Sequence, residues 1–161
     1  MAPAAVAIPE PPPPPPRPDP ARADRVLVLK SERIMHLLYE GEPFRTYKVA
    51  LGIQPVGHKM QQGDNRTPEG EYVLGRRNPG SRFHKSIHIS YPNAEDRASA
   101  RARGVDPGDL IMIHGVPPEI GDLGADHRLW DWTNGCIAVT NQEMDEIWDL
   151  VGPGTPIEIR P

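Results

Sequence analysis

The sequence predicts a mainly β protein with a few helices, in a single domain that follows a proline-rich tail. Short apolar runs rich in Val, Ile and Tyr recur along the chain, and turns rich in Gly and Pro separate them. Only two stretches have the composition or periodicity of a helix. The first twenty residues contain ten prolines, including an unbroken run from Pro11 to Pro16. Such a segment is typical of an extended polyproline II tether without a packed core.

The composition sets the expected domain boundary. We expect residues 1–23 to form a disordered tether and residues 24–161 to form one domain, since a chain of 161 residues has room for one. The apolar fraction of 37% and the mean hydropathy of −0.54 partly reflect the tail, so they do not indicate a disordered protein.

The expected strands begin directly after the tail. The first three should form a meander, because Glu40-Gly41 is a turn between the second and the third. The full set of expected strands is 25–30, 33–39, 47–51, 72–74, 87–89, 110–113, 137–139 and 157–159.

Two helices are expected. Residues 94–103 are rich in Ala and Arg and end at Gly104, a usual helix stop, with Arg97, Arg101 and Arg103 on a solvated face. The second helix starts at Thr140-Asn141-Gln142-Glu143, which has the sequence of a capping box. After it, apolar residues fall at helical spacing and are expected to pack in the core under the sheet: Met144, Ile147, Trp148 and Val151.

The only cysteine, Cys136, follows Gly135 and precedes an apolar strand, so a sharp turn would display its thiol. A lone cysteine is often a buried small hydrophobe, and that interpretation stands beside the catalytic one. The catalytic interpretation gains support from His114, which closes the apolar run 110–113. A histidine fixed at a strand end can act as the base for a thiol nucleophile.

These motifs resemble the L,D-transpeptidase catalytic domain of bacterial cell-wall enzymes, also called the YkuD domain. The resemblance runs from about Asp24 to the C-terminus and implies a β-sandwich or barrel domain. It rests on His114-Gly115 together with the ordered motifs 57–59, 63–64, 67–72, 86–92 and 131–139, the last of which contains Asp-Trp-Thr-Asn-Gly-Cys. Many members carry a histidine where this chain has Asn134, and an arginine or asparagine where it has Ala138.

The residue types predict the roles of His114 and of the main-chain amides, and the resemblance implies the role of Gly115. His114 would take the proton of the Cys136 thiol, giving a thiolate and imidazolium pair with a lowered thiol pKa. The carbonyl of Gly115 would orient the imidazole. Main-chain amides around Asn134, Gly135 and Cys136 would stabilise the oxyanion.

Further residues are candidates for substrate contacts: His88, Trp132 and Thr133. The connection that holds His127, Trp130 and Trp132 is either a lid over substrate or an apolar anchor for a long loop, and the sequence leaves both open. His36, His58 and His127 are expected to be surface or loop residues and not catalysts.

By the same resemblance, the substrate is a peptidoglycan tetrapeptide stem. It would be cut through a thioester between the diamino acid at position three and the terminal D-alanine. The acceptor is a second diamino acid, a lysine of an outer-membrane lipoprotein, or water. A transpeptidase is expected; the alternatives are a carboxypeptidase or amidase with the same site, and a non-catalytic wall-binding module with an inert thiol.

Charge, hydropathy and the histidine spacing bear on other classes of function and on location. A net charge of −4 gives no reason to expect nucleic-acid binding, and no apolar stretch is long enough to span a membrane. No cofactor and no metal are expected, since His84 and His88 lack a ligand set of known spacing. No secretory signal is visible at the N-terminus, although the resemblance implies the periplasm or cell wall.

Overall fold

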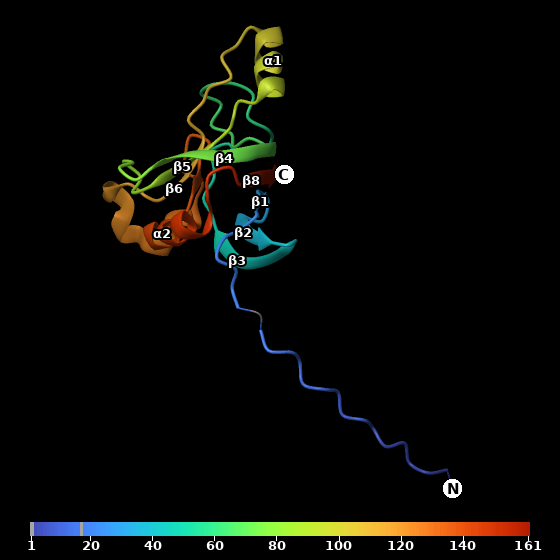
Figure 1. Cartoon of the computed structure of the whole chain (residues 1–161). Helices are drawn as coiled ribbons and strands as arrows, with labels where there is room; N and C mark the ends of the chain where they lie inside the picture. Colours follow the sequence, from blue (N-terminus) through green and yellow to red (C-terminus); the bar gives the residue numbers. More distant parts are fainter. Residues whose placement is uncertain (1, 17) are drawn as a thin grey trace.

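The structure, a computed structural model, describes residues 2–16 and 18–161. Residues 2–16 form neither helix nor strand, are exposed, and run away from the folded body (Figure 1). The carboxylate of Asp19 pairs with Arg45 of the folded body at 2.7 Å. The backbone N–H of Ala23 then donates to the carbonyl of Leu150 at 2.8 Å.

The body is built on one curled sheet of eight strands, so the predicted mainly β class is confirmed. The spatial order is β3-β2-β1-β8-β4-β5-β6-β7. The strands are β1 (Arg25–Leu29), β2 (Ile34–Tyr39), β3 (Glu42–Lys48), β4 (Gly70–Asn78), β5 (Ser86–Ile89), β6 (Met112–His114), β7 (Ile137–Ala138) and β8 (Pro156–Arg160).

The pairing of the strands places the first and last strands, β1 and β8, side by side within the sheet. The first three strands form the expected antiparallel meander. β8 inserts between β1 and β4, parallel to β1 and antiparallel to β4. β6 and β7 are also parallel, with Ile113 beside Ile137 and His114 beside Ala138. This register puts the residues around His114 next to the strand that follows Cys136.

The two edges of the sheet are tied together by the segment after β3. Ala50 and Ala138 exchange both backbone hydrogen bonds, at 3.0 and 2.9 Å. Two residues further on, Gly52 bridges Thr133. The curled sheet is thereby partly closed, and the closure lies directly behind the Cys136 turn.

Two α-helices match the sequence prediction. α1 (Ala94–Arg103) ends at Gly104, which has the left-handed φ of 67°. At its start, Asn93 and Asp96 form a capping box. α2 (Asn141–Leu150) begins with the predicted capping box of Thr140 and Glu143. In Figure 1, α2 lies beside the sheet and α1 projects from its far end.

A third helical segment, η1 (Pro118–Leu129), was not predicted from sequence. It consists of 3-10 turns interrupted at Gly124, whose φ of 52° and ψ of −128° are not helical. It has no amphipathic periodicity that would have marked it as a helix in the sequence.

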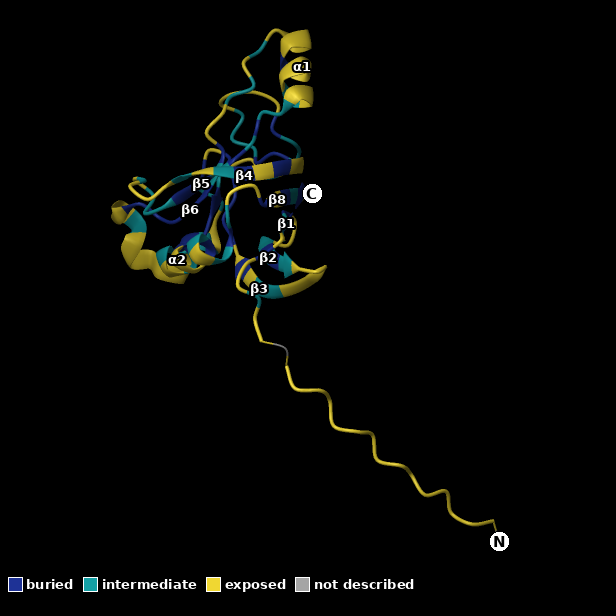
Figure 2. Ribbon diagram, viewed as in Figure 1, coloured by how far each residue is buried: buried dark blue, intermediate teal, exposed yellow. Residues whose placement is uncertain are grey.

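The core lies between the sheet and α2, where strand residues alternate between buried and exposed (Figure 2). Met144 and Ile147 of α2 are fully buried, as predicted. Trp148 is only half-buried, because its ring forms a platform for the Arg77 guanidinium, 3.8 Å from the ring centroid. The prediction that Trp148 is a core residue is therefore only partly correct.

Several strand boundaries differ from the sequence expectation. The strand expected at 110–113 begins at Met112, since Leu110 has a φ of 57° and is 56% exposed. The third strand starts at Glu42 and ends at Lys48. The apolar residues after it, Val49 to Leu51, are buried at the closure of the sheet instead of extending β3.

Candidate active site

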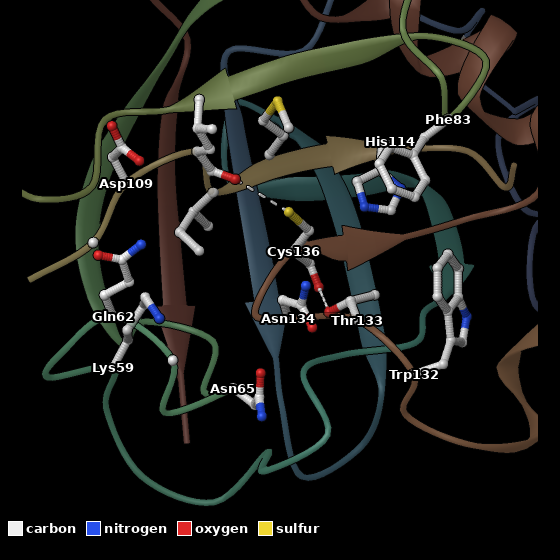
Figure 3. Close-up of a pocket in the computed structure, with 15 residues that line it drawn as sticks. Lys59, Gln62, Asn65, Phe83, Asp109, His114, Trp132, Thr133, Asn134 and Cys136 are labelled. Carbon is white, nitrogen blue, oxygen red and sulfur yellow. Dashed lines mark hydrogen bonds between the residues drawn. The ribbon is translucent and has the colours of Figure 1, made fainter.

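Cys136 lines a pocket of about 530 Å³. Its side chain is partly exposed to this pocket. In the view of Figure 3, His114 and Phe83 lie on one side of Cys136, and Asp109, Gln62 and Lys59 on the other. The lining residues are Lys59, Gln62, Gly63, Asn65, Phe83, Gly108, Asp109, Leu110, Ile111, Met112, His114, Trp132, Thr133, Asn134 and Cys136.

The turn before Cys136 depends on Gly135 and Thr133. Gly135 has a φ of 133°, and a Cβ at this position would lie 2.6 Å from the carbonyl oxygen of Arg66. Only glycine permits both the conformation and the close approach. The buried hydroxyl of Thr133 donates to the carbonyl of Cys136 at 2.7 Å and accepts from the N–H of Gly135 at 3.1 Å. The turn is therefore held by its own hydrogen bonds.

The segment that closes the sheet also anchors this turn. The N–H of Thr133 donates to the carbonyl of Leu51 at 3.1 Å, and the N–H of Ile53 donates to the carbonyl of Thr133 at 3.0 Å. Asp131 accepts from the N–H of Leu51 and pairs with Arg33 at 2.8 Å. Backbone pairing and this ion pair fix the residues that precede Cys136.

His114 ends β6 and is 2% exposed. Its Nδ1 lies 2.6 Å from the carbonyl oxygen of Gly115, so Nδ1 carries the proton and Nε2 has the free lone pair. The Phe83 ring stacks on the imidazole with 4.2 Å between centroids (Figure 3). Gly115 is enclosed as well, because a Cβ there would lie 2.3 Å from Oδ1 of Asn141.

Burial keeps both groups neutral before substrate binds. Burial lowers the pKa of His114 to about 4, and burial raises the pKa of Cys136 to about 11. The thiol donates to the carbonyl of Leu110, with 3.4 Å from Sγ to oxygen. Both shifts disfavour, in the unliganded site, the expected thiolate and imidazolium pair with a lowered thiol pKa. Removing the thiol and the imidazole from water favours their uncharged forms.

The three candidate substrate contacts have different surroundings. Thr133 lines the pocket, but its hydroxyl is used within the turn. Trp132 lines the pocket, half-buried, with its ring 5.8 Å from that of His114. His88 lies outside this pocket, in a neighbouring hollow on the outer face of β5.

The remaining histidines are held by structural contacts. His58 lies 2.8 Å from both Asp96 and the N–H of Glu69. His36 bonds the hydroxyl of Thr46, and His84 bonds Asp145 of α2. His127 belongs to η1 and is completely buried. In contrast, Trp130 is 49% exposed. The connection from His114 to Cys136 is therefore anchored by the buried His127, while Trp130 faces solvent.

Sequence reasoning missed Lys59 and Phe83 as parts of the site. Lys59 is 4% exposed, pairs with Asp64 at 2.9 Å, and its positive charge favours the thiolate of Cys136. Lys59 belongs to the motif 57–59 that supports the resemblance, but strand and helix periodicity places neither side chain beside Cys136, since both belong to irregular loops. Within residues 2–16 and 18–161, no group of three or more His, Cys, Asp or Glu side chains has the arrangement of a metal site. Over the same residues, no helix is long and apolar enough to cross a membrane.

The model of the YkuD family, the L,D-transpeptidase catalytic domain, matches residues 23–159. The chain belongs to this family. The match covers the whole sheet up to Ile159, together with the Cys136 turn and the His114 strand. The curated relative YafK of Escherichia coli K12, provisionally named an L,D-transpeptidase, is 36% identical over 132 residues. That alignment covers 78% of this chain and 46% of YafK, so the chain spans about half the length of this relative.

Solved structures share the fold. The helical cell shape determining protein Pgp2 of Campylobacter jejuni aligns with a TM-score of 0.63 and 27% identity, over 84% of this chain and 46% of Pgp2. An L,D-transpeptidase of Mycobacterium smegmatis aligns with a TM-score of 0.55 and 13% identity, over 85% of this chain and 58% of that one. Each of these alignments covers about half of the matched chain.

Proposed function

We propose that this YkuD domain is a cysteine L,D-transpeptidase acting on peptidoglycan tetrapeptide stems through a thioester acyl-enzyme. One observation carries the proposal: Cys136 opens into a pocket that also contains His114, whose imidazole is fixed by the Gly115 carbonyl with Nε2 free to accept a proton. Acyl transfer by a thiol requires a base close to the nucleophile. The pairing of His114 with Ala138, two residues after Cys136, supports this role for His114.

Acylation starts from neutral partners. As Sγ of Cys136 bonds to the carbonyl carbon of the diamino acid, the thiol proton passes to Nε2 of His114. The tetrahedral intermediate then collapses, the bond to the D-alanine nitrogen breaks, and His114 returns the proton to that nitrogen. The protonated imidazole exists only during this step, which agrees with a pKa lowered to about 4 by burial.

The oxyanion would be stabilised by backbone N–H groups of the turn. The N–H of Gly135 already donates to Thr133, so Gly135 contributes conformation instead of a donor. The N–H groups of Asn134 and Cys136 are the donors we assign to the oxyanion.

Resolution of the thioester decides between transfer and hydrolysis. In transfer, an amine gives its proton to His114 and attacks the thioester carbonyl, and the Cys136 sulfur leaves and regains a proton. A carboxypeptidase or amidase would use water at the same step. The hydrolytic alternative is favoured by Ala138, which is fully buried at the sheet closure and so presents no polar group to an acceptor.

The proposed substrate sets the expected location and partners. A domain that acts on stem peptides would work in the periplasm or cell wall. An outer-membrane lipoprotein is a partner only if its lysine is the acceptor, or if the amidase releases it.

Product analysis tests the proposal. Tetrapeptide is incubated with the protein, with and without an added D-amino acid, and the products are identified by mass. Exchange of the terminal D-alanine for the added amine supports transfer. Tripeptide alone at every amine concentration supports the carboxypeptidase, and intact tetrapeptide in both conditions contradicts both.

A further inference from the structure

A second hollow adjoins the Cys136 pocket on the outer face of the sheet. It has a volume of about 440 Å³ and shares Phe83, Leu110 and Met112 with the Cys136 pocket as lining residues. Met112 is the β6 partner of His88 on β5, which lines the second hollow. The two hollows therefore adjoin each other at these shared residues.

A β-bulge in β4 gives this hollow its positive charge. Leu74 pairs with Ile89 and Arg77 pairs with Ile87, so three steps along β4 face two along β5. Without the extra residue, Arg76 would share the inner face with the buried Leu74. The bulge turns Arg76 to the outer face, where His88 lies between Ile87 and Ile89.

Arg76 differs from the other arginines of the hollow. The Arg82 guanidinium pairs with Glu119 at 2.8 Å, and the Arg77 guanidinium stacks on Trp148 and bonds its carbonyl. Arg76 makes no hydrogen bond or ion pair with the described residues, and its charge, after burial, helps to lower the pKa of His88. Among the described residues no carboxylate lines the hollow, although Asp109 lies on the neighbouring wall of the Cys136 pocket and its charge acts to raise the pKa of His88. The hollow therefore offers an unpaired guanidinium beside an imidazole.

The hollow borders Leu110, whose carbonyl accepts from the Cys136 thiol, and extends to the His114 side of Cys136. Phe83 stacks on the His114 ring and lines both hollows, and Ser86, which lines the second hollow, is the β5 partner of His114. In the proposed reaction, His114 gives its proton to the departing amine and takes one from the incoming amine. The group that binds beyond Phe83 is therefore on the amine side of the scissile bond.

We propose that Arg76 and His88 form a subsite for the free carboxylate of the amino acid on the amine side, either the leaving D-alanine or an incoming D-amino acid. This inference rests on the proposed function and names the feature that the site would recognise. A guanidinium bound to a carboxylate makes a charge-assisted hydrogen bond, which neutral amides do not replace.

Binding to the Cys136→Ala protein tests the subsite separately from turnover. The affinities of the tetrapeptide and of its C-terminal carboxamide are compared, with and without Arg76→Gln. We expect the free acid to bind about tenfold more tightly than the carboxamide, and Arg76→Gln to reduce this ratio to near one. Arg101→Gln is the matched control, since Arg101 is exposed on the projecting helix α1; it should leave the ratio unchanged.

The results that would overturn the subsite differ from those that would overturn the proposed function. An equal affinity for acid and carboxamide in the protein with Arg76, or an equal loss for both in Arg76→Gln, would overturn the subsite. The subsite would also be overturned if affinity fell only when the other carboxylates of the donor stem were amidated. In the protein with Cys136, the rates of exchange with isotope-labelled D-alanine and with D-alaninamide are compared. A preference for labelled D-alanine that depends on Arg76 would assign the subsite to the incoming carboxylate, and equal rates would assign it to the leaving one. Failure to cleave any tetrapeptide, with the binding ratio intact, contradicts the proposed function and leaves the subsite standing.

Discussion

The indole N–H of Trp132 donates a hydrogen bond to Nδ1 of His127, with 3.2 Å between the nitrogens. His127 is fully buried, and its Nε2 has no partner among the described residues. Trp132 also packs at a tilt against His114, with 5.8 Å between ring centroids. His127, a residue of η1, therefore fixes the indole of Trp132 beside His114, the proposed base.

Replacing His127 should loosen Trp132. His127→Leu removes the acceptor and leaves the indole N–H unpaired, at a cost of about 1–3 kcal/mol in the free energy of unfolding. His127→Asn keeps an acceptor and should cost less. The indole N–H resonance of Trp132 and the turnover rate measure the effect. An unchanged resonance in His127→Leu would show that this hydrogen bond does not position the indole.

A methyl group at Gly135 should disrupt the Cys136 turn. Its φ of 133° is unfavourable for alanine, and the added Cβ would lie 2.6 Å from the Arg66 carbonyl. Gly154→Ala is the control, since Gly154 also has a positive φ, 87°, but nothing within 4 Å of the added Cβ. We expect Gly135→Ala to lower the free energy of unfolding by roughly 1–3 kcal/mol more than the control. Urea unfolding of both variants checks this, and equal losses would contradict the close packing of the turn.

His114→Gln should slow alkylation of Cys136 by iodoacetamide near neutral pH. With the thiol pKa raised to about 11 by burial, few thiolates exist at pH 7, and a base must take the proton. Removing the base should reduce the rate on the order of a hundredfold. The two rates should converge as the pH approaches 11, where the thiolate forms without help. Equal rates across the whole pH series would count against the pairing, and no alkylation of either protein would favour an inert thiol.

Stability should fall as the pH drops below neutral, partly because of His114. Burial lowers the folded-state pKa of His114 to about 4, below an unfolded value near 6.5. Below pH 6.5 the unfolded chain gains a proton that the folded protein does not bind, so unfolding becomes more favourable until about pH 4. For His114 this amounts to about 3 kcal/mol.

The comparison of pH 7.5 with pH 4.5 isolates this effect. Urea unfolding at both pH values should show a smaller loss for His114→Gln than for the unsubstituted protein. Burial also lowers the pKa of His127, which contributes equally to both proteins. An identical loss in the two proteins would mean that His114 is not buried in its neutral form.

The sequence predicted the elements whose cause is local. The capping box at Thr140 and the stop at Gly104 involve residues close in the chain, and both helices form as expected. The strand order and the closure through Ala50 and Ala138 depend on pairing between distant segments, which periodicity does not reveal.

The site shows the same division. The Gly135-Cys136 turn was visible in the sequence, because glycine beside a lone cysteine is a local signal. The neutral state of the thiol was not, since it depends on burial by segments far away in the chain. The hollow beside His88 depends on a bulge in β4. Gly75 is the one sequence signal for it, since a glycine within a strand often marks a bulge.

The central claim is that Cys136 becomes acylated by the tetrapeptide, and intact-protein mass spectrometry tests it most directly. After brief incubation and acid quenching, we predict an added mass equal to the tripeptide acyl group, located on Cys136 and removed by hydroxylamine as a thioester. Cys136→Ala, with an unchanged circular dichroism spectrum, should gain no mass and release no D-alanine. Release of D-alanine by Cys136→Ala would contradict the assignment of the nucleophile.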